Sequence, residues 1–66
     1  MNNDNCREAL ETVHTSQIGV CKKLAQKIAI AAVSNRAEVI LFGEQLEEEQ
    51  DVLYAIEAAM RSTAYG

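Results

Sequence analysis

The chain has 66 residues, a net charge of −4 and a hydrophobic content of 48%. This length allows a single domain, residues 1–66, and the hydrophobic content is typical of a folded chain rather than a disordered one. The acidic balance argues against direct binding to nucleic acid or to an anionic membrane surface. A chain this short buries only about 60% of its unfolded surface, so an isolated monomer is expected to be marginally stable.

The two cysteines do not predict a disulfide or a metal site. Cys6 and Cys21 are fifteen residues apart in one expected helix, which separates them by about 22 Å, whereas a disulfide needs Cα atoms within about 7 Å. Together with His14 they are strung along one helix, unlike the convergent ligands of structural zinc. We therefore expect no cofactor, and we predict that the chain gains its stability from self-association or from a protein partner.

The N-terminus has no basic region followed by an apolar segment, so a signal peptide is not expected. The longest nearly apolar run, residues 28–33, is far shorter than the roughly 20 residues of a membrane span. These features and the unpaired cysteines predict a cytoplasmic location.

The first predicted helix covers residues 6–33, after a polar tail at residues 1–5. Asn5 and Glu8 have the spacing of a capping box at its start. Residues 14–19 contain poor helix formers and mark a potential break, although we favour a continuous helix. Most of the hydrophobic stripe of this helix is predicted to consist of Leu10, Val13, Val20, Leu24, Ile28 and Ala32, with Cys21 and Ala25 beside them.

A turn is predicted at residues 34–36, followed by a second helix over residues 36–63. Asn35 and Glu38 again have capping-box spacing. An alternative is an α-β-β-α arrangement, because residues 27–33 and 38–42 contain β-branched residues around a short turn. The alanines at 29, 31 and 32 favour helix instead.

The second helix carries a heptad pattern, with alternating steps of three and four residues. Glu49 interrupts this hydrophobic seam: it reaches solvent at the seam edge, pairs with a cation, or marks a face that meets another protein. The pattern predicts an all-α, antiparallel two-helix hairpin that dimerises into a four-helix bundle. The seam residues predicted to pack or self-associate are Leu10, Leu24, Ile28, Val39, Phe42, Leu46, Leu53, Ile56 and Met60.

In such a hairpin, residues whose numbers sum to about 70 lie side by side. Lys22, Lys23 and Lys27 would then partly neutralise the acidic run of the second helix. That run is also a candidate surface for a partner, which we expect to be a protein, including one with a basic surface. The predicted partner-binding residues are Glu44, Glu47, Glu48, Glu49, Asp51 and Tyr54.

No catalytic motif is present, and His14 lacks a nucleophile on its own helical face. We therefore expect a non-enzymatic protein-binding module that acts as an adaptor, chaperone or inhibitor. One alternative is an acidic inhibitor that blocks a nucleic-acid-binding protein, whose binding would weaken steeply with salt. Another is a small-ligand binder, with His14, Thr15, Ser16 and the lysines lining a pocket between subunits.

The segment Gln50-Asp51-Val52-Leu53-Tyr54-Ala55-Ile56 is similar to the C-terminal helix of the needle-subunit co-chaperones of type III secretion. In size, acidity and two-helix layout, the chain also resembles the small acidic inhibitors that bacteriophages make against host defence systems. The first resemblance implies a chaperone or adaptor, and the second implies an inhibitor.

Overall fold

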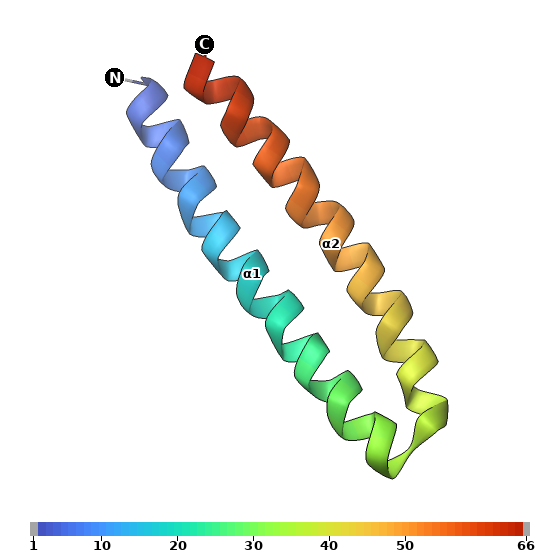
Figure 1. Ribbon diagram of the computed structural model, residues 1–66. Coiled ribbons are helices and arrows are strands. Elements are labelled where there is room, and N and C mark those ends of the chain that lie inside the picture. The colour runs from blue at the N-terminus through green and yellow to red at the C-terminus, as the bar shows by residue number, and fades with distance from the viewer. Residues whose placement is uncertain (1, 66) are drawn as a thin grey trace.

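The computed structural model describes residues 2–65, and the side chains of residues 5–63. These residues form two helices, α1 (Asn2–Ser34) and α2 (Arg36–Tyr65), with no strand between them. The helices lie side by side and antiparallel, with the turn at one end of the rod and both termini at the other (Figure 1). The predicted all-helical fold is confirmed, and the α-β-β-α alternative is wrong. The Cα atoms extend over 50 × 14 × 11 Å.

Helix α1 differs from its predicted boundaries at the N-terminus. It begins at Asn2, so residues 2–5 are helical rather than a tail, and Asn5 lies within the helix rather than capping it. The physical reason is that a capping residue favours a helix start without enforcing one, and no proline or glycine in this segment ends the helix. Farther along, α1 is continuous through residues 14–19.

Asn35 alone separates the two helices. Its backbone N–H donates to the Ala31 carbonyl oxygen (2.7 Å), and its own carbonyl accepts from the Glu38 N–H (3.1 Å). Its side-chain Nδ2 donates to Glu38 Oε1 (3.1 Å). Asn35 and Glu38 are therefore paired, but not as the predicted capping box, in which the Glu38 carboxylate would accept from the Asn35 N–H. That N–H is already used by the last turn of α1.

The interface between the helices is a narrow heptad contact. Three hydrophobic side chains are buried in it, namely Leu24, Ala31 and Ile56. On α2, every position of the predicted seam is buried or half-buried. On α1, the buried and half-buried positions that follow the same three-and-four spacing are Leu10, His14, Gln17, Cys21, Leu24, Ile28 and Ala31.

The α1 stripe is therefore rotated from the predicted one. Val13 and Val20 are 48% and 39% exposed, and Ala32 is exposed as well. His14 and Gln17 take the inward positions instead. Two helices in contact bury mainly the two heptad positions that face the partner, so the wide hydrophobic stripe of α1 cannot all be covered.

The register of the hairpin follows from pairs across the interface. His14 bonds to Glu57, and the Lys27 ammonium lies 5.8 Å from the centre of the Phe42 ring. In both pairs the two residue numbers sum to about 70, as predicted for residues that lie side by side. The expected lysine–glutamate pairs do not form: within residues 5–63, the one acid–base contact closer than 4.0 Å is His14–Glu57, which is an ion pair when His14 is protonated. The lysines therefore offset the acidic run only at longer range.

The burial of Ile56 leads to a first prediction. We expect Ile56→Ala to lower the free energy of unfolding by about 2–4 kcal/mol, because it removes a buried side chain from the interface. The matched control is Ile30→Ala, since Ile30 is 68% exposed, and its effect should stay within about 0.5 kcal/mol. Urea unfolding followed by circular dichroism, at one chain concentration, measures both. Equal effects of the two changes would contradict the buried position of Ile56.

A second prediction concerns Gly19, which lies inside α1. A Cβ built at Gly19 meets no atom within 4 Å. We expect Gly19→Ala to raise the free energy of unfolding by about 0.5–1 kcal/mol, because alanine loses less backbone entropy in a helix. The same urea titration measures this change. A loss of stability would show that the space beside Gly19 is not open.

Candidate interaction surface

Glu49 is held by a hydrogen-bonded contact across the hairpin. Gln17 Nε2 on α1 donates to Glu49 Oε1 (2.8 Å) and to the Glu49 backbone oxygen (2.7 Å). Both side chains are half-buried. The carboxylate therefore points towards α1 and pairs with a neutral amide rather than with a cation.

A second polar contact lies nearer the open end of the hairpin. His14 Nε2 is 3.1 Å from Glu57 Oε2, with side-chain exposures of 23% and 38%. Because an ionised carboxylate only accepts hydrogen bonds, Nε2 must carry the hydrogen in this contact. The half of the interface near the turn is thus hydrophobic, whereas the half near the termini contains two polar pairs. Polar groups at such positions specify register in helical assemblies.

Sequence reasoning missed Gln17 as an interface residue and placed His14 at the rim of the seam opposite Ile56, not in contact with Glu57. The available signal was the heptad itself: steps of three and four from Ala31 back through Ile28 and Leu24 lead to Cys21 and then to Gln17. The predicted stripe instead selected hydrophobic residues along α1, and these included Val20 and Val13. The spacing was more informative than the residue type.

All but one of the acidic residues in the run lie on one exposed side of α2. Glu44, Glu48 and Asp51 are exposed, whereas Glu49 is turned into the interface. Glu47 is also exposed and is seven residues from Tyr54, so these two side chains lie on one side of the helix. Glu44, Glu47, Glu48 and Asp51 follow the i, i+3, i+4, i+7 spacing of one helix face, so the predicted acidic surface is continuous apart from Glu49.

Tyr54 is 60% exposed, and its aromatic ring is available for contact with another protein. Ile40 lies fourteen residues earlier on the same side of α2 and is 70% exposed. Together with Glu47 they form a line along the helix, with an acidic group between two hydrophobic ones.

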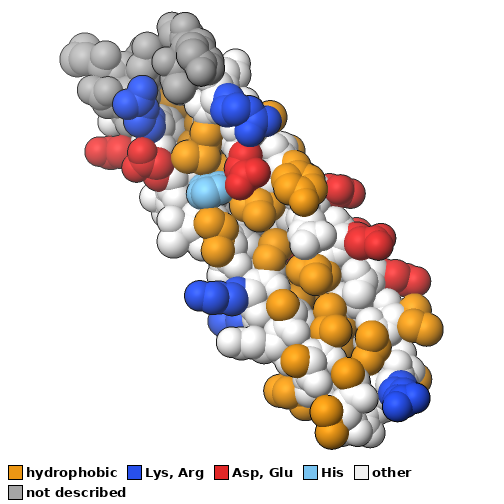
Figure 2. Space-filling model, in the orientation of Figure 1, with side chains coloured by type: hydrophobic (Ala, Val, Ile, Leu, Met, Phe, Trp, Pro, Cys, Tyr) orange, Lys and Arg blue, Asp and Glu red, His pale blue; other side chains and the backbone are white. Residues whose placement is uncertain are grey.

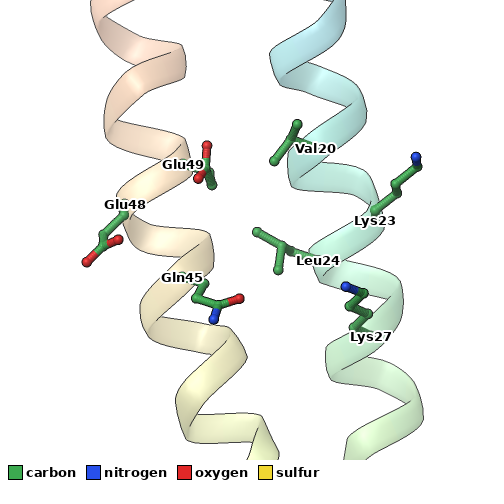
Figure 3. A pocket seen from close by; sticks show the side chains of 7 residues that line it. All are labelled: Val20, Lys23, Leu24, Lys27, Gln45, Glu48 and Glu49. Carbon is green, nitrogen blue, oxygen red and sulfur yellow. The ribbon is translucent and has the colours of Figure 1, made fainter.

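The lysines and His14 line separate hollows. Lys23 and Lys27 border a shallow hollow of about 280 Å³ with Gln45 and Glu48 (Figure 3), in which Lys23 and Glu48 extend outwards at opposite edges. His14 borders a different hollow, beside Glu57 and Arg61. The helices appear in reversed positions in Figures 1 and 3, so the lysine hollow opens on the back of the hairpin as drawn in Figure 1. The candidate ligand-binding residues therefore do not converge within one chain.

The remaining chemical features are limited. Cys6 is exposed, Cys21 is half-buried, and both are free. Within the described part of the chain, no three His, Cys, Asp or Glu side chains gather closely enough to hold a metal ion. Neither helix, over the residues described, contains a stretch long and apolar enough to cross a bilayer.

Large hydrophobic side chains remain on the surface of the hairpin. Among the side chains that the structure describes, nine large hydrophobic ones are more than a third exposed, against three hydrophobic residues that are buried. The exposed residues are Val13, Ile18, Val20, Ile30, Val33, Ile40, Leu41, Val52 and Tyr54.

Comparisons with protein-family models, curated proteins and solved structures found no match for this chain. The two resemblances based on residues 50–56 and on the layout of the chain therefore gain no support from them.

The Gln17–Glu49 contact leads to a third prediction. We expect Gln17→Leu alone to lower the free energy of unfolding by about 1 kcal/mol, because it leaves a half-buried carboxylate without its donor. We expect the double change Gln17→Leu with Glu49→Leu to raise it by roughly 1–3 kcal/mol, because two hydrophobic groups then pack in the seam. Urea titration of the parent chain and the two variants tests the predicted order of their free energies of unfolding. A double variant less stable than Gln17→Leu would contradict this account.

Proposed function

We propose that the chain is a non-enzymatic protein-binding module: a helical hairpin that dimerises into a four-helix bundle and serves as an adaptor, chaperone or inhibitor. The observation that carries this proposal is the excess of exposed over buried hydrophobic side chains. Contiguous apolar surface on a small protein is characteristic of sites of protein association.

The exposed area supports association quantitatively. The chain exposes 5077 Å² at a mass of 7.3 kDa. Folded monomers of this mass expose about 4,200 Å², so the hairpin has roughly 900 Å² in excess. A stable protein–protein interface of standard size buries about 800 Å² on each partner. Docking of one partner of similar size would therefore bury about as much of the hairpin's surface as it exposes in excess of a compact monomer.

The other functions considered from the sequence have less support. An acidic inhibitor would use the exposed acidic side of α2, which lacks Glu49 because that carboxylate faces inwards. A ligand site built on His14 and the lysines needs them in one pocket, whereas they line separate hollows. The outward side chains Glu44 and Asp51 remain available to orient a further partner, since exposed charges contribute more to specificity and association rate than to affinity.

Self-association gives the fourth prediction. Sedimentation equilibrium at micromolar concentration should return twice the chain mass of 7.3 kDa. The mass should change little between about 0.05 and 0.5 M NaCl, because an apolar interface is weakly screened by salt. Circular dichroism at the same concentrations controls for helix content. A fully helical species with the mass of one chain would contradict the proposed dimer.

A further inference from the structure

One side of the hairpin is nearly free of charge along half of its length. Helical spacing places Ile18, Ala25 and Ala32 of α1 on the same side of the interface as Gly43 and Tyr54 of α2. We call this side, between residues 18–32 and 40–54, the uncharged face. Figure 2 shows it as a band of hydrophobic side chains below the single histidine.

Charged residues border this face without entering it. Lys22 lies at its α1 edge and Glu47 at its α2 edge, at about the same level along the hairpin. Figure 2 shows basic side chains on one edge and acidic side chains on the other. The opposite side of the hairpin also exposes hydrophobic side chains, among them Val13, Val20 and Val52. It is charged as well, because Lys27, Glu38 and Glu48 line its hollows.

We propose that a second copy of this chain docks on the uncharged face, with the turns of both copies at the same end. This inference rests on the proposed self-association. It specifies which face of the hairpin forms the dimer interface and how the two copies are oriented. The two-fold axis would run along the rod, between the copies, so that α1 of each copy packs antiparallel on α2 of the other.

Charge complementarity selects a copy of the chain as the occupant. The two-fold rotation exchanges the two edges of the face, so Lys22 of each copy meets the partner's Glu47. Neither side chain has an ion-pair partner within the described part of its own chain. A face with one basic and one acidic edge is thus complementary to itself when rotated about the rod axis.

The remaining edge positions include one unfavourable contact. At the open end, Glu11 meets the partner's Glu57, a like-charge contact that His14 moderates through its bond to Glu57. The other pairs that the rotation brings together are Ala29 with Ile40, Thr15 with Tyr54, and Glu8 with Arg61. Most of these edge contacts are therefore hydrophobic or opposite in charge.

The opposite orientation is less favourable. If the turns lay at opposite ends and the uncharged faces overlapped fully, Glu47 would lie close to the partner's Glu47. Two carboxylates at the rim repel each other, whereas the proposed orientation pairs each with an ammonium group.

The middle of the face permits close packing of helices. Ala25, Ala32 and Gly43 present small side chains or none, and a Cβ built at Gly43 meets no atom within 4 Å. Exposed Ile18, Ile40 and Tyr54 surround this flat centre. A second hairpin here would cover large hydrophobic groups, and the excess exposed area of roughly 900 Å² matches what each partner of a standard interface buries.

The test compares Ala25→Glu with Ala55→Glu in the full chain. Both replace an exposed helical alanine and add the same charge, but Ala55 lies away from the uncharged face. We expect Ala25→Glu to raise the dimer dissociation constant, measured by sedimentation equilibrium, at least about tenfold. Ala55→Glu should leave it within about threefold. Equal constants for the two variants would overturn the assignment of the face.

The orientation has its own test. Glu47→Lys should weaken the dimer, and adding Lys22→Glu should restore it, because the double change reverses both edges. A double variant that does not regain the parent dissociation constant would overturn this part of the proposal, because in the opposite orientation both changes only replace one like-charge pair with another. A parent chain that stays monomeric refutes the proposed function itself, whereas a dimer indifferent to Ala25→Glu refutes only the face.

A measurement on the unaltered chain covers the case in which a variant fails to fold. Carbodiimide joins an ammonium group to a carboxylate in direct contact. In a mixture of ¹⁴N- and ¹⁵N-labelled chains, mass spectrometry should find mixed-isotope peptides that join Lys22 to Glu47. Intermolecular cross-links confined to other lysines, such as Lys27 on the opposite side, would contradict the docking geometry.

Discussion

Two helices touch along a single line, and this constraint shapes the whole molecule. Each helix can bury only the side chains that face its partner, so among residues 5–63 three hydrophobic residues are buried and nine large ones remain exposed. The rod is 50 Å long but only 14 Å and 11 Å in its other dimensions. A structure of this shape cannot form a central core, and its remaining hydrophobic surface is therefore the feature most relevant to function.

Polar contacts occupy part of this limited interface. Gln17–Glu49 and His14–Glu57 use seam positions that hydrophobic residues could fill with greater stability. These contacts fix the register of the two helices, because a hydrogen bond between specific side chains is lost when one helix slides along the other. The turn also helps to fix the register. Asn35 forms hydrogen bonds to both Ala31 and Glu38, and so joins the helices through a single residue.

The two sides of the hairpin differ in chemistry although they share the same backbone. Alanines and a glycine lie on one side, whereas lysines and glutamates border the hollows on the other. This asymmetry favours an apolar, close-packed association on the first side and leaves charged groups exposed on the second.

The sequence alone was sufficient to determine the helical class, the position of the turn near Asn35, the antiparallel register and the α2 seam from Val39 to Met60. These features depend on local spacing, which is visible in one chain. The inward positions of His14 and Gln17 were decided only by the tertiary structure, because several helix rotations bury similar amounts of hydrophobic surface on α1. The contact with α2 selects the rotation that gives Glu49 and Glu57 their partners. The direction of the Glu49 side chain was likewise beyond sequence analysis, since the amide that binds it lies on the other helix, 32 residues away.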